Sequence, residues 1–191
     1  MTRNQERSFI ARITCDGEDM TFFDQILSSR HFVSNGRTSA TPPNIVTTFE
    51  AYDPDSEEML PVGGITTTTM VIHFRCYGDY YNMQILSEAY YQKYFSKNRQ
   101  GVVGALPAAG GDTTSFNLLD INHRIITLDD LSADTATIHL KARNTAIIRK
   151  EIWRDPVYRS CFTDKSGDIA TFRLVILERH ASTPQRSTPY T

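Results

Sequence analysis

Residues 20–35, MTFFDQILSSRHFVSN, align without a gap on residues 83–98, MQILSEAYYQKYFSKN. Residues 138–150, IHLKARNTAIIRK, follow the same apolar pattern after a two-residue shift. Three related stretches in one chain predict an internal three-fold repeat, which indicates the fold before any motif does. The first two copies match most clearly at four positions: Met20 with Met83, Phe22 with Ile85, Phe32 with Phe95 and Asn35 with Asn98.

A second repeated feature is a short pair of residues that ends in phenylalanine. It occurs as Thr48-Phe49, Ser115-Phe116 and Thr171-Phe172. We expect Phe49, Phe116 and Phe172 to form one layer of a shared core, because a single unit of such a repeat cannot bury its apolar face alone.

Short runs with partial apolar alternation flank each copy, and Gly- or Pro-containing turns separate them, among them Asp16-Gly17, Gly78-Asp79 and Ser166-Gly167. Four runs in each of three copies predict twelve strands in an all-β chain. The predicted fold is a β-trefoil, in which a six-stranded barrel is closed by three hairpins. The repeats would cover about residues 8–60, 70–121 and 123–178, with residues 124–128 opening the third copy.

Length and composition bound the remaining possibilities. The chain has 191 residues and a formal charge of -2. We expect one domain over residues 8–178, with flexible tails at 1–7 and 179–191, because the tails are polar or rich in Ser, Thr and Pro.

Charge and hydropathy indicate the compartment and exclude some partners. Interspersed charges give no basic stripe for nucleic acid, and no apolar stretch is long enough for membrane insertion. There is no conventional signal peptide, and three cysteines without a metal-ligand spacing read as reduced thiols. The expected location is the cytoplasm.

The first candidate site is the stretch WRDPVY, residues 153–158, in which Pro156 favours a loop or an edge strand. An aromatic face can cover the apolar side of a pyranose ring, and neighbouring charged groups can pair with its hydroxyls. We therefore take Trp153, Arg154, Asp155 and Tyr158 as candidate glycan ligands. The alternative is that Trp153 caps the open end of the barrel.

The second candidate site is the turn in YGDYYN, residues 77–82. Tyr80, Tyr81 and Asn82 are the candidate ligands here, because Tyr and Asn at a turn are typical of adaptable recognition surfaces. An ordinary hairpin turn has the same composition, and strand alternation will bury some of these rings.

No pattern in the sequence indicates catalysis, a metal or a cofactor. The five histidines show no paired spacing that would bind a metal, and the acidic run of residues 53–58 lacks the glycine and distal glutamate of a calcium loop. We expect a protein that is not an enzyme, with no catalytic residue, metal site or cofactor.

The third copy and the later segment ATFRL, residues 170–174, resemble the units of fascin-like and amaranthin-like agglutinin domains within the β-trefoil superfamily. The Gln-x-Trp signature of ricin-type lectin domains is absent from all three copies. The resemblance implies a binding module, and it transfers no particular binding residue.

The leading hypothesis is a lectin that binds a glycan or glycoconjugate. Single shallow sites bind weakly, so a homodimer would raise the avidity. The alternative is a protein-interaction module, such as a protease inhibitor or cytoskeletal binder. Its contacts would come from the loops at residues 36–44 and 100–112.

Overall fold

The computed structural model describes residues 2–25, 44–47, 69–107, 111–153, 159–184 and 188–190. In these ranges the chain is all-β, as predicted. A sheet of 14 strands is accompanied by the short helix α1 (Arg3–Glu6) and the 3-10 helix η1 (Leu128–Asp130).

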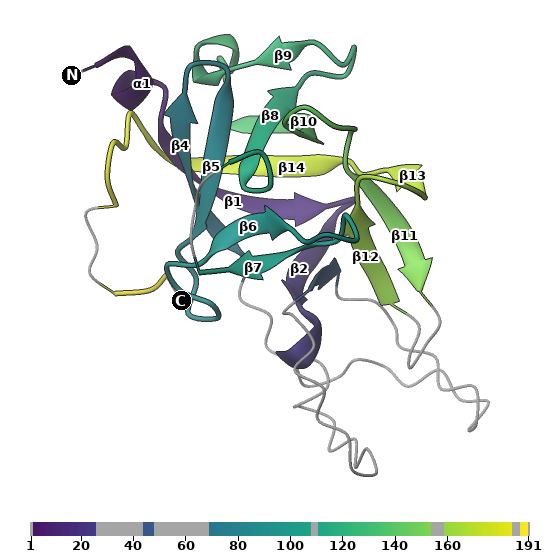
Figure 1. Cartoon of the computed structure of the whole chain (residues 1–191). Helices are drawn as coiled ribbons and strands as arrows, with labels where there is room; N and C mark the ends of the chain where they lie inside the picture. The colour runs from purple at the N-terminus through teal and green to yellow at the C-terminus, as the bar shows by residue number, and fades with distance from the viewer. Residues whose placement is uncertain are drawn as a thin grey trace.

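Six antiparallel strands close into a barrel, in the spatial order β1, β14, β10, β8, β5 and β4, with β4 returning to β1 (Figure 1). Closure pairs both edges of every barrel strand, which removes the exposed edges that favour aggregation. The strands are β1 (Phe9–Cys15), β4 (Val71–Tyr77), β5 (Tyr80–Ile85), β8 (Ser115–Leu119), β10 (Thr135–Ala142) and β14 (Phe172–Arg179).

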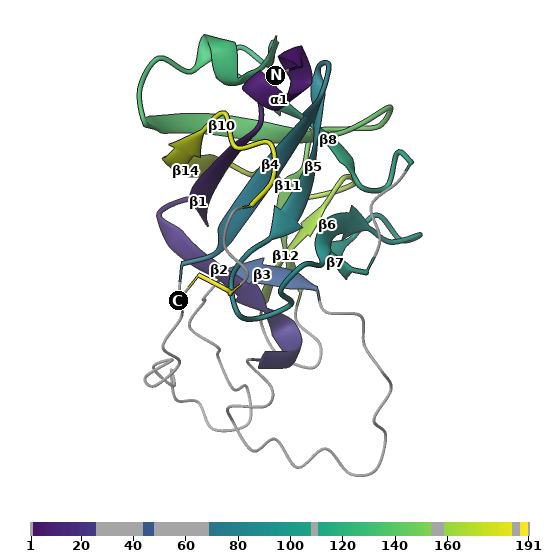
Figure 2. The same cartoon turned by 90° about the vertical axis from the view of Figure 1, so that its left-hand side faces the viewer.

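The remaining strands lie outside this barrel, and most of them gather at one of its ends (Figures 1 and 2). Most of these outer strands form three antiparallel pairs. The pairs contact one another through the bridges Asn44 to Gly104, Val102 to Thr163 and Cys161 to Val46. The pairs are β2 (Glu18–Phe22) with β3 (Ile45–Thr47), β6 (Tyr94–Lys97) with β7 (Val103–Leu106), and β11 (Arg149–Trp153) with β12 (Arg159–Thr163). Two-residue strands β9 (Ile125–Ile126) and β13 (Asp168–Ile169) pair with β8 and β11.

The β-trefoil prediction is corrected accordingly to a closed six-stranded barrel with additional strands outside it. The third copy shows the difference most clearly, because its described residues form six strands, β9 to β14, where four were predicted. Residues 124–128 form only the short strand β9 before the chain enters η1. The stretch 138–150 runs from the end of barrel strand β10 into β11 and turns back on itself as a hairpin does, with an antiparallel bridge between Lys141 and Ile147. A capping box explains the early end of β9, because Thr127 and Asp130 bond to each other's backbone and side chain.

Two predicted hairpin turns are confirmed. Asp16 and Gly17 both have positive φ, 51° and 84°, as a two-residue turn between β1 and β2 requires. Gly78 has φ 77° at the first position of the two-residue turn between β4 and β5, where Tyr77 pairs with Tyr80.

The barrel interior is filled with side chains. In β1, Phe9, Ala11, Ile13 and Cys15 are fully buried in the main core, as the two-residue period of a strand dictates. Phe116 and Phe172 are buried as predicted, whereas Phe49 lies outside the described residues. A cavity of about 10 Å³ between Met20, Phe116, Phe172 and their neighbours is too small for an organic ligand. A binding site in the described residues must therefore be sought on the surface.

Both terminal stretches contact the barrel. Residues 3–6 of the expected N-terminal tail form α1, which packs beside β4. In the expected C-terminal tail, Ala181 is buried and its carbonyl accepts a hydrogen bond from Nε2 of His73 at 2.7 Å. Further along, the backbone N–H of Tyr190 donates to the carbonyl of Leu86 at 2.8 Å. Ala181 of this tail therefore belongs to an outer apolar cluster with Ile10, Val71 and Leu86.

Candidate functional site

Tyr81, one of the predicted ligands, is a core residue. It is 0% exposed, and the edge of its ring meets the face of Phe9 at a centroid distance of 5.7 Å. Its hydroxyl accepts a hydrogen bond from the backbone N–H of Leu128 at 3.0 Å. Burial raises the pKa of Tyr81 well above its ordinary value, so the phenol stays neutral. Asn82, the next residue, is also buried, so neither side chain is presented to a ligand.

Trp153 ends β11 and is only partly exposed. It packs against a small apolar cluster of Phe23, Val46 and Cys161, and its Nε1 donates to Oε2 of Glu151 at 3.1 Å. Trp153 therefore packs on residues outside the six barrel strands, and the alternative that it caps the open end of the barrel stays a prediction. Arg154, Asp155 and Tyr158 lie outside the described residues.

Tyr80 is a partly exposed predicted ligand, and it lies in a group with three residues absent from our predicted site. Its ring stacks on the ring of Tyr77, with centroids 5.7 Å apart and planes 16° apart. The guanidinium carbon of Arg143 lies 4.0 Å from the centroid of Tyr80. The guanidinium carbon of Arg75 lies 5.4 Å from the centroid of Tyr77. We call Arg75, Tyr77, Tyr80 and Arg143 the aromatic ledge.

Strand pairing explains why these residues meet. Tyr77 and Tyr80 are the last paired residues on either side of the β4–β5 turn, and Arg75 lies two residues before Tyr77 on the same outward face. Arg143 follows β10, and its backbone N–H donates to the carbonyl of Ser115 at 2.9 Å. Ser115 pairs with Asn82 of β5, which places Arg143 across β8 from Tyr80.

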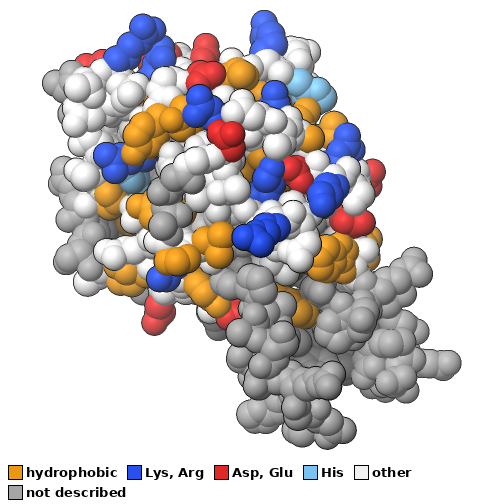
Figure 3. Space-filling view, viewed as in Figure 1, with side chains coloured by type: hydrophobic (Ala, Val, Ile, Leu, Met, Phe, Trp, Pro, Cys, Tyr) orange, Lys and Arg blue, Asp and Glu red, His pale blue; other side chains and the backbone are white. Residues whose placement is uncertain are grey.

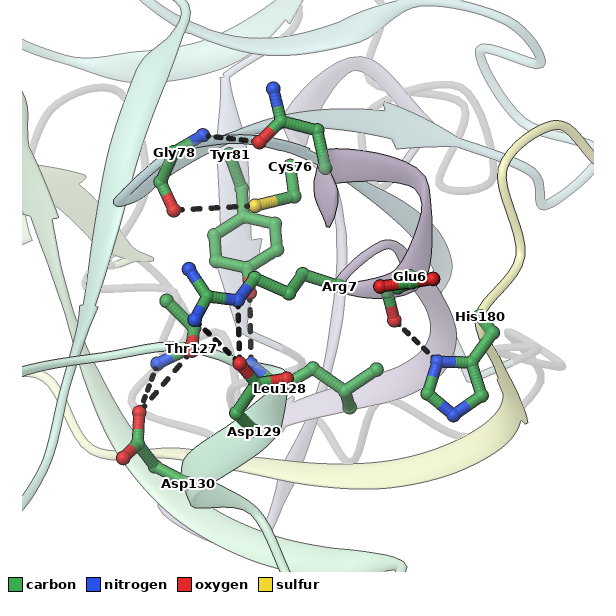
Figure 4. A network of polar contacts seen from close by, with 11 residues as sticks. Glu6, Arg7, Cys76, Gly78, Tyr81, Thr127, Leu128, Asp129, Asp130 and His180 are labelled. Carbon is green, nitrogen blue, oxygen red and sulfur yellow. Dashed lines mark hydrogen bonds and ion pairs between the residues drawn. The ribbon is translucent and has the colours of Figure 1, made fainter. Parts of the chain in front are cut away.

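A polar network anchors the turn that carries the aromatic ledge (Figure 4). Oδ1 of Asn4 in α1 accepts from the backbone N–H of Gly78 at 3.0 Å. Nearby, Arg7 donates to Oδ2 of Asp129 at 2.6 Å, which ties the end of α1 to η1. The same end of the barrel holds the bond between Tyr81 and Leu128. The turn is thus attached to two helices, which reduces the conformational freedom that a ligand would otherwise have to restrict.

The polar groups of the aromatic ledge are open to a ligand. Among the described residues, the hydroxyls of Tyr77 and Tyr80 make no hydrogen bond, and neither Arg75 nor Arg143 forms an ion pair. Asp79, exposed at the tip of the turn, likewise has no ion pair in the described part of the chain. Tyr77 is 36% exposed. This surface combines flat apolar area with donors at its ends and an acceptor at the turn.

A different surface feature is the turn between β8 and β9. Ile121 is 70% exposed and Ile125 is 47% exposed, which is unusual for isoleucine. Oδ1 of Asp120 accepts from the backbone N–H groups of Asn122 and Arg124, both at 2.9 Å, and Arg124 also donates to Oδ2. The bond from the Arg124 amide, with the other bonds, holds the pKa of Asp120 below its ordinary value. A shallow hollow of about 630 Å³ adjoins the turn.

Reactive side chains do not cluster in the described residues. Cys15, Cys76 and Cys161 are buried and form no disulfide. Burial raises the pKa of Cys76, so its thiol, which donates to the carbonyl of Gly78, is a poor nucleophile. His73 and His139 each bond a backbone carbonyl. The described residues contain no group of three or more side chains arranged to bind a metal.

Comparisons with known proteins found no match to a family model, to a curated protein or to a solved structure. The resemblance to fascin-like and amaranthin-like domains therefore stays a prediction. In the described part of the chain, no helix has the length and apolar character needed to cross a membrane.

Proposed function

We propose that this protein is a non-catalytic glycan-binding protein and that the aromatic ledge is its binding site. The observation that carries the proposal is the stacked pair of Tyr77 and Tyr80 at an anchored turn, with their hydroxyls unbonded within the described residues. The proposed site is therefore the turn that carries Tyr80 and not the stretch that begins at Trp153.

Sugar chemistry fits this surface in two ways. The apolar C–H face of a pyranose gains contact area against aromatic rings, which carry much of the energy in polar recognition sites. The phenol hydroxyls and the carboxylate of Asp79 can pair with the hydroxyls of the sugar. Because the rings already stack on each other and on Arg143, little side-chain entropy is lost on binding.

A single site of this size binds weakly, and a dissociation constant on the order of 1 mM corresponds to only about -4 kcal/mol. Useful affinity then requires several sites on one particle, so we include a homodimer in the proposal. Surface charge favours a glycan over nucleic acid as the partner. On the face drawn in Figure 3, acidic and basic side chains alternate and hydrophobic ones form small separate patches.

The proposal is tested on a glycan array with the full chain and the Tyr80→Ala variant. We expect saturable binding to a related set of glycans and its loss in the variant, whose thermal unfolding should match that of the wild type. A folded wild-type protein that binds none of the glycans would overturn the proposal.

A second candidate function is protein binding through the β8–β9 turn. The earlier expectation placed this activity in residues 36–44 and 100–112. Residues 36–43 lie outside the described residues, and the second segment contains the strand β7, with Val103 and Ala105 buried. Ile121 instead projects from a turn that Asp120 and Arg124 close, and an apolar side chain on a preorganised turn suits a partner's pocket.

The aromatic ledge and the β8–β9 turn provide matched controls for one another. If protein binding is the function, Ile121→Asp should abolish capture of the partner while Tyr80→Ala leaves it unchanged. The opposite pattern, with Ile121→Asp neutral, would exclude the turn as the contact.

A further inference from the structure

Two guanidinium groups flank the aromatic ledge, and no described carboxylate neutralises either of them. Arg143 lies 4.0 Å from the centroid of Tyr80 and Arg75 lies 5.4 Å from that of Tyr77. The five ion pairs formed by described residues use Arg7, Lys97, Arg124, Lys150 and Arg179 instead. A neutral sugar can accept hydrogen bonds from a guanidinium but offers no charge to neutralise it.

The geometry of a stacked guanidinium decides what it can bind. When Arg lies over a ring, its flat face contacts the π-system while its N–H groups point outward in the plane of the group. These N–H groups then form a planar fork that matches two oxygens of a carboxylate or sulfate group. The guanidinium carbon of Arg143 lies over the Tyr80 ring at 4.0 Å from its centroid, a distance that fits such a contact and favours an outward-facing fork before a ligand arrives.

Asp79 limits where a negative charge on the ligand can sit. Its exposed carboxylate belongs to the turn between the two tyrosines and repels an acidic group placed over the middle of the aromatic ledge. The acidic group must therefore lie toward Arg143 or Arg75, and the hydroxyls of the sugar toward Asp79. The charges thus leave two positions for the acidic group, one at each arginine.

We propose that the aromatic ledge selects acidic glycans, binding a carboxylate or sulfate group at Arg143, with Arg75 beside the ring of Tyr77 as a second cationic group. This inference rests on the proposed function, since it names the class of glycan taken by the same site. Arg143 is the residue that determines specificity, and the two tyrosines provide the contact area common to all ligands.

The test uses matched probes that differ only in charge. Lactose, its 3′-sialylated form and its 3′-sulfated form are presented on one surface, together with the same three forms of N-acetyllactosamine. The proteins compared are the wild type, Arg143→Gln, Arg143→Lys and, as a control, Arg173→Gln. Arg173 is an exposed residue on β14, away from the aromatic ledge.

The wild type should prefer at least one acidic form over its neutral parent by about tenfold or more, which corresponds to about 1.4 kcal/mol. Arg143→Gln should bind the acidic and neutral forms equally, and Arg143→Lys should keep only part of the preference, because Lys lacks the planar fork. Arg173→Gln should behave as the wild type. The sialylated and sulfated arms show which acidic group is preferred.

Three outcomes would overturn the inference, and they are distinguishable. Equal binding of neutral and acidic forms by the wild type leaves the proposed function standing and removes the acidic preference. An acidic preference that survives Arg143→Gln places the anion elsewhere. Displacement of the probes by a single-stranded oligonucleotide at lower concentration than by sulfated lactose would indicate a nucleic-acid ligand. By contrast, a folded protein that binds no form overturns the proposed function itself, provided that it also binds nothing on the wider array.

Discussion

The ring of Phe9 lies parallel to the ring of Phe74, with centroids 4.5 Å apart and planes 3° apart. The two residues are paired across β1 and β4, and the ring of Tyr81 lies nearly perpendicular to both rings, with centroids 5.7 and 6.2 Å away. This contact joins two barrel strands that are distant in the sequence, and it lies beneath the turn that carries the aromatic ledge. Stability of the barrel and position of the site therefore depend on the same cluster.

Truncation of a side chain in this cluster should lower the free energy of unfolding. Phe74 is fully buried, so Phe74→Ala should lower the free energy of unfolding by about 3–5 kcal/mol through lost burial and a cavity. Phe74→Leu should cost less, because more of the volume remains. Urea unfolding monitored by fluorescence measures both changes. A loss below about 1 kcal/mol for the alanine variant would show that the cluster does not close the barrel.

Removal of the Tyr81 hydroxyl should lower the stability of the protein without changing its affinity for a glycan. Tyr81→Phe leaves the backbone N–H of Leu128 without its partner, which should cost about 1–3 kcal/mol. Because Tyr81 is buried, glycan affinity should stay the same at a temperature where the variant is folded. A stable variant with lost affinity would place Tyr81 in the site.

Stability should fall in mild acid because of His73. Burial lowers the pKa of His73 below its ordinary value, and the nearby charge of Arg75 adds to this effect, although hydrogen bonds to Ala181 and Gln84 oppose it. The folded state then binds fewer protons than the unfolded state, so the stabilisation is complete above about pH 6.5 and declines as pH falls toward the folded pKa.

The pH effect is measured by unfolding at pH 5 and pH 7.5. The loss attributable to His73 is at most about 1.4 kcal/mol per pH unit. His73→Gln keeps a donor for the carbonyl of Ala181 and should show a smaller difference between the two pH values. If the variant keeps the full pH dependence of the wild type, the acid sensitivity arises elsewhere.

The buried ion pair of Lys97 and Asp164 should be sensitive to removal of one partner. The Nζ to Oδ2 distance is 2.6 Å, and the two side chains are 11% and 10% exposed. Lys97→Met leaves a buried carboxylate unpaired and should cost about 3–5 kcal/mol. Adding Asp164→Asn removes that charge and should recover part of the loss.

Thermal denaturation of the single and double variants measures this coupling. The exposed neighbour Lys165 provides the control, since Lys165→Met should change stability by less than about 0.5 kcal/mol. A double variant less stable than Lys97→Met would mean that the charge of Asp164 is not the source of the loss.

The sequence predicted those features that depend on local chemistry. Asp16-Gly17 and Gly78-Asp79 form the expected turns because few residues tolerate positive φ there. The end of β9 also had a local signal, since Thr127 followed by Asp130 is a capping box, and this signal was overlooked in favour of alternation. The strand expected over residues 124–128 is therefore shortened to Ile125–Ile126.

The aromatic ledge could be predicted only in part. Alternation indicates that one of Tyr80 and Tyr81 points outward, but which one depends on the register of β5 against β4 and β8. Arg143 reaches Tyr80 only because β10 pairs with β8 and β8 with β5, a relationship that no local pattern contains. Trp153 drew attention as the single tryptophan, yet tertiary packing covers much of it.

The most direct test of the glycan-binding account is the dissociation constant of the strongest array glycan for three proteins: wild type, Tyr80→Ala and Ile121→Ala. The account predicts that Tyr80→Ala binds at least about tenfold more weakly, a change of about 1.4 kcal/mol, with Ile121→Ala unchanged and all three equally stable. A folded Tyr80→Ala variant that binds as tightly as the wild type would contradict it.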